Sequence, residues 1–240
     1  MQTIICNNYQ EVSAAAAKII MKQIDRKPDC VLGLATGSTP EGTYRELIRA
    51  YREGNVSFAQ VRTVNLDEYC PIRPSDPQSY RYFMNTKLFN HVDIDKANTY
   101  VPDGMTETPE KEGERYEKII SDLGGIDLQL LGVGRNGHIG FNEPGDELFV
   151  NTHLTDLSAQ TIAANARFFA SEKDVPRQAL TMGMSSILKS RKILLLACGS
   201  EKQAAIRHIL DDKITTQWPA SMLALHPDVT VICDRAAIGE

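Results

Sequence analysis

Residues 128–145 read LQLLGVGRNGHIGFNEPG, an apolar run that passes directly into a glycine-rich loop. The run Leu128–Val133 is apolar on both faces of a strand, which is typical of a parallel strand covered by helices on both sides. Five glycines between positions 132 and 145 surround one histidine, His138, and one glutamate, Glu143. The stretch therefore predicts a buried parallel strand that delivers a functional loop at its carboxyl end.

The rest of the chain alternates between short apolar runs and segments of helical period. A typical helical stripe is formed by Tyr44, Leu47, Ile48 and Tyr51 at i, i+3, i+4 and i+7. The alternation predicts an α/β fold of Rossmann-like type, an open, doubly wound and mostly parallel sheet with helices on both faces. The expected further strands are Thr3–Cys6, Val31–Ala35, Val61–Leu66, Ile193–Cys198 and Val229–Cys233.

Domain organisation follows from the same pattern. The sequence contains no linker, so residues 1–240 are expected to form a single domain. Residues 143–190 fit the alternation less well, and we expect a small hairpin or lid within them.

Composition limits the function classes. The chain carries a net charge of −5 and has 42% hydrophobic and 24% charged residues, which is ordinary globular composition. A mildly acidic chain without a Lys/Arg run is a poor nucleic-acid binder. An odd number of cysteines, five, without a C-x-x-C motif indicates neither disulfides nor a zinc site. With no signal peptide and no membrane-length apolar run, we expect a cytoplasmic protein.

Two loops after predicted strands suit a phosphate group. Residues 36–39 (Thr36, Gly37, Ser38, Thr39) follow Val31–Ala35 and precede a helix, with Thr39 expected as N-cap and Pro40 as first helical residue. Backbone N–H groups and the helix dipole would converge there on an anion, although a simple capped turn is the alternative. Lys202 follows Ile193–Cys198 and is expected in the first turn of the next helix, where a cation is unfavourable without an anion. A solvated surface lysine is the alternative.

The remaining candidates are acids and bases. Asp67 and Glu68 follow Val61–Leu66, and because neighbouring strand residues face opposite ways, only one should enter the site. They could equally be exposed loop charges. His138 suits proton transfer near neutrality, and Glu143 could orient the imidazole. A metal site is disfavoured, because His138 has no second histidine nearby and no H-E-x-x-H motif or Cys pair exists.

Three motifs together resemble the glucosamine-6-phosphate deaminase family, in its short non-allosteric form. They are Thr36-Gly37-Ser38-Thr39-Pro40, Asn65-Leu66-Asp67-Glu68-Tyr69 and the stretch from Gly132 to Pro144, and their order and spacing match the family across nearly the whole chain. The stretch around His138 is highly specific, whereas the first motif is shared more widely. The wider superfamily includes 6-phosphogluconolactonase.

The resemblance implies conversion of glucosamine 6-phosphate and water to fructose 6-phosphate and ammonia, without a cofactor. It implies that His138, supported by Glu143, opens the sugar ring, and that Asp67 removes the C2 proton. It places the phosphate on residues 36–39, Lys202 and Arg167. Allosteric members carry Asp where this chain has Asn136, so Asn136 is expected only to orient the His–Glu pair.

The resemblance also bears on regulation. Allosteric members have an Arg-x-Lys pair at the positions of His153 and Thr155, and a C-terminal extension beyond the position of Glu240. Two fixed cations are poorly replaced by His153 and Thr155. We therefore expect no activation by N-acetylglucosamine 6-phosphate, and a monomer or a low homo-oligomer.

Three other functions compete with the deaminase. A sugar-phosphate lactonase would need no C2 proton abstraction and hence no Asp67. A deaminase or isomerase for galactosamine 6-phosphate would differ only in the contacts that read C4. A non-catalytic sugar-phosphate sensor would be expected to add a DNA-binding module, which the acidic charge disfavours.

Overall fold

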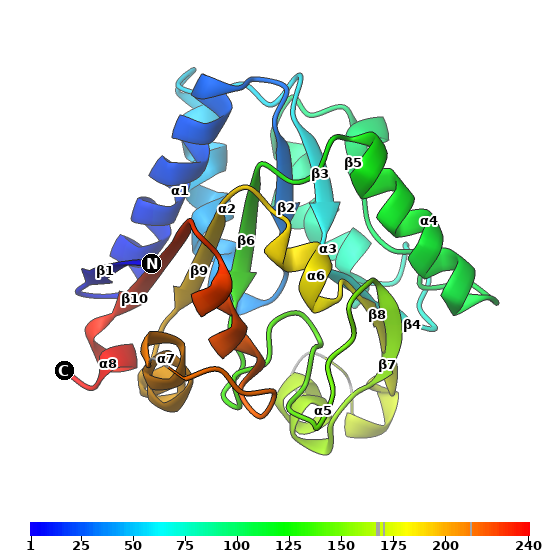
Figure 1. The fold of residues 1–240 in the computed structure, drawn as a ribbon. Coiled ribbons are helices and arrows are strands. Elements are labelled where there is room, and N and C mark those ends of the chain that lie inside the picture. The colour runs from blue at the N-terminus through cyan, green and yellow to red at the C-terminus, as the bar shows by residue number, and fades with distance from the viewer. Residues whose placement is uncertain (167–168, 170, 212) are drawn as a thin grey trace.

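A seven-stranded parallel sheet forms the centre of the chain in a computed structural model, which describes residues 1–166, 169, 171–211 and 213–240 (Figure 1). Within these residues the strand order is β1-β10-β9-β6-β2-β3-β5, and every neighbouring pair is parallel. The predicted mostly parallel, doubly wound sheet is confirmed. Its strands are β1 (Gln2–Cys6), β2 (Val31–Leu34), β3 (Arg62–Asn65), β5 (Thr99–Tyr100), β6 (Leu128–Gly132), β9 (Ile193–Ala197) and β10 (Val229–Asp234).

Side chains alternate along these strands between two apolar cores. On β9, Ile193 and Leu195 belong to one core, and Leu194 and Leu196 belong to the other. All four are almost completely buried, which is why the run has no polar position. Leu195 aligns with Leu131 of β6 and Val231 of β10, so one register extends across the centre of the sheet.

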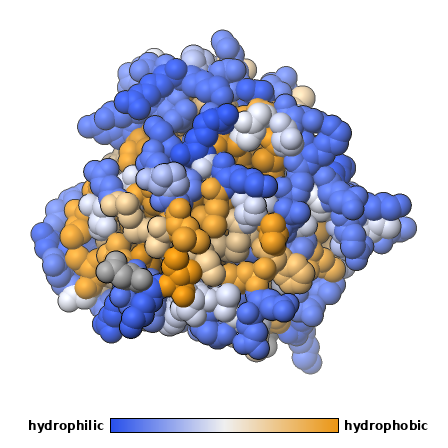
Figure 2. All heavy atoms as spheres, viewed as in Figure 1, coloured by the Kyte–Doolittle hydropathy of each residue, from blue (hydrophilic) through white to orange (hydrophobic). Residues whose placement is uncertain are grey.

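Helices cover both faces of this sheet. Residues of α1, α2 and α3 pack in the core that contains Leu194, and residues of α4, α6 and α7 pack in the other. The outer sides of α1 and α4 are hydrophilic, as Figure 2 shows, while apolar residues lie nearer the centre of that view. The helices that surround the large sheet are α1 (Tyr9–Arg26), α2 (Ser38–Arg52), α3 (Tyr80–Lys87), α4 (Pro109–Asp122), α6 (Met184–Leu188), α7 (Gln203–Leu210) and α8 (Arg235–Ile238).

A second, antiparallel sheet adjoins the carboxyl edge of the first. Its strand order is β4-β8-β7, with β4 (Asp67–Cys70), β7 (His153–Asp156) and β8 (Gln178–Thr181). The chain between β7 and β8 includes helix α5 (Ala159–Asn165). Within residues 143–190, where a small hairpin or lid is expected, the structure has two antiparallel strands with α5 between them, followed by helix α6.

The structure corrects the assignment of residues 67–69 to a loop. Asp67 begins β4, which pairs with β8, Asp67 lying opposite Thr181. The chain therefore passes from the large sheet to the small one at Leu66 with no intervening loop.

The remaining regular structure consists of short 3-10 turns. None of the helices in the described part of the chain is long and apolar enough to cross a membrane. The turns are Phe89–His91, Lys96–Asn98, Glu172–Asp174, Ser200–Lys202 and Pro219–Leu225.

Candidate active site

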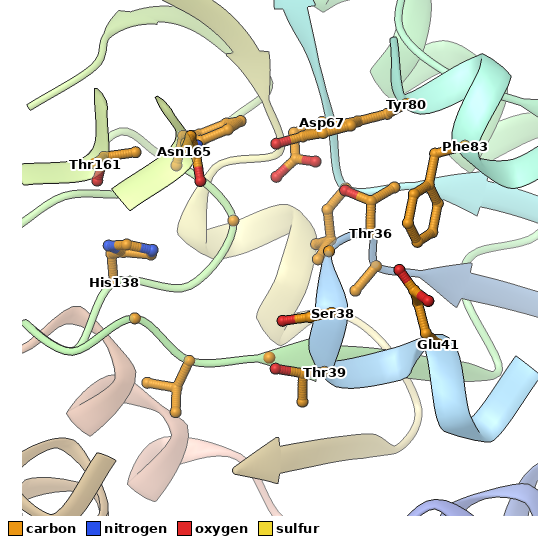
Figure 3. A pocket seen from close by; sticks show the side chains of 18 of the residues that line it. Thr36, Ser38, Thr39, Glu41, Asp67, Tyr80, Phe83, His138, Thr161 and Asn165 are labelled. Carbon is orange, nitrogen blue, oxygen red and sulfur yellow. The ribbon is translucent and has the colours of Figure 1, made fainter. Parts of the chain in front are cut away.

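One cavity of about 1210 Å³ lies where the loops after β2, β6 and β9 meet the start of β4. The carboxyl edge of a parallel sheet is where doubly wound folds bind ligands. Figure 3 shows His138 and Thr161 on one side of this cavity, and Asp67 and the start of α2 on the other. The predicted site residues that line the cavity are Thr36, Gly37, Ser38, Thr39, Asp67, Asn136, His138 and Lys202.

Helix α2 presents its amino end to the cavity. The structure corrects its start: the helix begins at Ser38, two residues earlier than predicted, and the N-cap is Gly37 rather than Thr39. Pro40 is therefore the third helical residue, a position a proline tolerates because no N–H is needed in the first turn. Gly37 has no side chain, and no side chain caps this helix. Its first-turn amides and positive dipole end thus point toward a cavity suited to an anion.

Lys202 reaches the same cavity from the other side of the sheet. It ends the 3-10 turn Ser200–Lys202 directly before α7, rather than lying within the first α-helical turn. The Gly199 N–H donates to both carboxylate oxygens of Asp234, at 3.0 and 3.1 Å. Asp234 also caps α8 by accepting from the Ala237 N–H at 2.9 Å. Sequence reasoning missed Asp234. Its signal is an acidic residue directly after the apolar run Val229–Cys233, where a strand is predicted to end.

Asp67 and Glu68 point in opposite directions, as the strand alternation predicts. Asp67 lines the cavity, whereas Glu68 accepts backbone N–H bonds from Tyr69, Tyr80 and Arg81 at 2.8–3.0 Å. Burial, with a smaller contribution from the Glu68 charge, raises the pKa of Asp67 to about 8. Burial also raises the pKa of Glu68, while the three backbone donors and Arg81 oppose that rise. Asp67 is thus a buried carboxyl whose affinity for protons suits a general base near neutral pH.

His138 and Glu143 are neighbours within the glycine-rich loop. The Nδ1 atom of His138 lies 3.4 Å from Oε2 of Glu143, and the two side chains are 23% and 14% exposed. A Cβ atom on Gly134 would lie 2.2 Å from the His138 ring, so only glycine lets the imidazole lie there. Asn136 donates from Nδ2 to Glu143 Oε2 at 2.7 Å, and its Oδ1 accepts from the backbone N–H of His138 at 3.3 Å.

Thr161 of α5 is a second donor to Glu143, and sequence reasoning missed it. Its hydroxyl donates to Glu143 Oε1, while Ser158 caps the same helix by accepting from the Thr161 N–H at 3.1 Å. Burial alone would raise the pKa of Glu143. Interactions with His138, Thr161 and Asn136 outweigh it and hold the pKa of Glu143 at about 2. Glu143 is therefore a fixed negative charge beside the imidazole.

The cavity wall includes further residues that the sequence pattern did not single out. An aromatic group, Tyr69, Tyr80 and Phe141, packs with ring centroids 4.8–6.1 Å apart beside Asp67. Arg45 also reaches the cavity, from the exposed side of α2. Arg167, predicted as a phosphate contact, lies outside the described residues.

Known proteins are similar to this chain over nearly its whole length. A family model described as "Glucosamine-6-phosphate isomerases/6-phosphogluconolactonase" matches residues 7–232. A curated glucosamine-6-phosphate deaminase of Clostridium perfringens (strain 13 / Type A) is 55% identical over 237 residues, covering 99% of this chain and 98% of the relative. The Geobacillus sp. (strain WCH70) protein of the same name is 54% identical over 238 residues, covering 99% and 95%.

Solved structures show the same relationship. A protein described as a monomeric glucosamine-6-phosphate deaminase superposes with a TM-score of 0.97 at 50% identity, covering 99% of this chain and 98% of its own. The 6-phosphogluconolactonase of Trypanosoma brucei has a TM-score of 0.78 at 21% identity, covering 98% and 97%, and shares the fold. By the family match and these full-length identities, the chain belongs to the family of glucosamine-6-phosphate isomerases and 6-phosphogluconolactonases.

Proposed function

We propose that this protein is a glucosamine-6-phosphate deaminase, which converts glucosamine 6-phosphate and water to fructose 6-phosphate and ammonia. The observation that carries the proposal is the buried carboxyl of Asp67 in the same cavity as His138. Isomerisation removes a proton from C2 and so requires a base such as Asp67 there, whereas lactone hydrolysis removes no proton from C2. The relatives that are more than 50% identical over nearly the full chain bear the deaminase name.

Ring opening is the first step, and we assign it to His138. The imidazole moves a proton between the anomeric hydroxyl and the ring oxygen, and the fixed charge of Glu143 stabilises the protonated ring that forms in between. Asn136 holds Glu143 in place through its 2.7 Å hydrogen bond, which supports a purely orienting role for this amide.

Isomerisation and loss of the amine follow at Asp67. The carboxylate takes the C2 proton of the open-chain aldose and returns it to C1, through an enediol-like intermediate that still bears the amine. Ammonia then leaves and water supplies the oxygen of the ketose. The substrate provides its own carbonyl, so the proposed chemistry uses only general acids and bases, each of which contributes about 10²–10⁴-fold.

We place the phosphate group between the start of α2 and the lysine loop. The amides of residues 36–39 supply neutral donors, and Lys202 supplies a charge. Arg167 completes the proposed contacts by its position in the family motif. Two separately anchored loops would fix the distance between the phosphate and Asp67, which positions C2 for proton transfer.

We further propose that the protein works as a single-domain monomer or low homo-oligomer without an activator. His153, at one of the two positions where allosteric relatives carry cations, lines a second cavity of about 570 Å³ together with Glu110, Glu114 and Glu117. Burial lowers the pKa of His153, so the imidazole is neutral at pH 7. A cavity with three carboxyls and a neutral imidazole disfavours a phosphate ester.

The proposal is tested by measuring ammonia release with glucosamine 6-phosphate and galactosamine 6-phosphate side by side. We expect release from the former, and its loss in Asp67→Asn with the fold retained. Ammonia from neither sugar, or full activity of Asp67→Asn on the true substrate, would contradict the deaminase mechanism.

A further inference from the structure

The first turn of α2 is bridged by Tyr9 of α1, which also lines the cavity. The Tyr9 hydroxyl donates to the carbonyl of Ser38 at 2.8 Å and accepts from the N–H of Gly42 at 2.7 Å. It therefore bridges the two ends of the helical turn whose residues Ser38, Thr39 and Glu41 line the cavity. Tyr9 is 29 positions from Ser38 and 33 positions from Gly42 in the chain, so the bridge is a tertiary contact rather than a local cap.

Two features of the sequence make this contact geometrically possible. Position 42 has no side chain, and a Cβ atom there would lie 2.1 Å from the Ser13 hydroxyl and 2.9 Å from the Tyr9 hydroxyl. Glycine thus lets α1 approach the start of α2 closely. Tyr9 itself is the first residue of α1 and is fixed by the Asn8 cap and by a 2.8 Å bond from Ser13 to its carbonyl.

The bridge replaces what an ordinary cap would provide. The starts of α1, α3, α5 and α8 are each capped by a side chain, whereas α2 begins with Gly37 and, like α4, α6 and α7, has no side-chain cap. A capping side chain at α2 would occupy the amides that a phosphate needs. The Tyr9 hydroxyl also lines the cavity, but it binds the turn through the Ser38 carbonyl and the Gly42 N–H rather than through the amides of residues 36–39, so it fixes the geometry of the turn without competing for those amides.

We propose that Tyr9 is a positioning residue for phosphate binding, one that pre-organises the α2 amides without touching the substrate's reacting atoms. This inference rests on the proposed function for its substrate, but its physical content is affinity for a phosphate group. Fixing the donors beforehand lowers the ordering cost of binding. Its loss should therefore weaken binding and leave the chemical step almost unchanged.

The test compares Tyr9→Phe with Tyr51→Phe, which makes the same change near the far end of α2. Inorganic phosphate serves as the probe, and its Kd is measured from the dependence of Tm on phosphate concentration at constant ionic strength. KM and kcat for glucosamine 6-phosphate are measured in parallel. We expect Tyr9→Phe to raise both the phosphate Kd and KM about three- to tenfold, the range for loss of one hydrogen-bonding group, with kcat within about twofold of wild type.

The outcomes separate the inference from the proposed function. A wild-type protein that releases no ammonia, yet binds phosphate more tightly than Tyr9→Phe, would support the inference while refuting the deaminase. Unchanged phosphate affinity in Tyr9→Phe overturns the inference. It is also overturned if Tyr51→Phe loses as much phosphate affinity as Tyr9→Phe, or if the wild-type protein does not bind phosphate. A fall in kcat at constant KM overturns it too, because a merely structural role would reduce the active fraction and not the affinity.

Discussion

At the scale of the single residue, Asp67 shows a conflict between stability and function. Its carboxyl is almost fully buried, and burial raises its pKa to about 8, so the folded protein holds this proton far more tightly than the unfolded chain does. A raised pKa favours folding at low pH, and that contribution is lost as pH rises from about 4 to about 8. Ionised Asp67 therefore destabilises the protein at the pH where a base is useful.

Asp67→Asn removes this cost. We expect its stability advantage over wild type to grow by about 5 kcal/mol between pH 4 and pH 8, and to level off above that. Urea unfolding at a series of pH values measures the difference, with the exposed carboxyl variant Asp122→Asn as control. A difference that does not change with pH would show that Asp67 is ionised throughout. Activity should fall at least about 100-fold in the same variant.

The pH–rate profile is the kinetic counterpart. We expect kcat/KM to rise through the titration of the Asp67–Glu68 pair and to level off only above about pH 8, because only ionised Asp67 can accept the C2 proton. Glu68 raises the pKa of Asp67 through its charge, so Glu68→Gln should shift this limb to lower pH. A limb that does not move in Glu68→Gln would assign the titration to another group.

At the scale of the element, α5 links the small sheet to the catalytic loop through one hydroxyl. Thr161→Val removes the donor to Glu143 while keeping the shape of the side chain. We expect the free energy of unfolding to fall by about 1 kcal/mol at pH 7, and kcat to fall severalfold. The pKa of Glu143 is depressed in the folded protein, so this stabilisation exists above about pH 4.5 and is lost as pH falls toward 2.

Urea unfolding at pH 7 and pH 3 measures this effect. The difference in free energy of unfolding between Thr161→Val and wild type should be smaller at the lower pH. Thr155→Val on β7 is the matched control, since its hydroxyl makes only a 3.4 Å bond to the Asp156 carbonyl. Equal effects of the two variants would show that the loss reflects side-chain packing in general.

Elements with a strong hydrophobic period could be predicted from the sequence, and elements made by tertiary contact could not. Each predicted strand of the large sheet ends within one residue of the observed one, because runs such as Ile193–Ala197 are apolar on both faces. Strand β5 has two residues, too few to show a period. Strand β4 contains Asp67 and Glu68, which read as loop charges until their burial and the pairing with β8 are known.

At the scale of the whole molecule, a prediction concerns assembly and regulation. We expect a solution mass near the 26.6 kDa of one chain, hyperbolic rates and no response to N-acetylglucosamine 6-phosphate. The carboxyls around the second cavity give a phosphate ester no favourable charge there. Light scattering and initial rates with and without that compound measure these properties. Sigmoidal rates that the compound makes hyperbolic would contradict the prediction.

Much of the candidate site could also be predicted at this scale, because parallel strands bring their carboxyl ends to one edge. Residues as distant as Thr36 and Lys202 line a single cavity for that reason. Asp234 ends β10 at this same edge and could have been found in this way, whereas Tyr9 and Thr161 could not. Each of these two acts through a contact with backbone or side chain of another segment, and such pairings leave no mark in the spacing of residues along the chain.

The passage of the chain from one sheet to the other at Leu66 has a consequence for engineering. The base is carried by the small sheet, whereas the imidazole and the proposed phosphate donors are carried by the large one. The two sheets are joined beside Asp67 by the bond from the Met182 N–H to the Leu66 carbonyl, 2.8 Å long. Because this seam lies directly beside Asp67, we expect a cross-link across it to shift the base relative to His138.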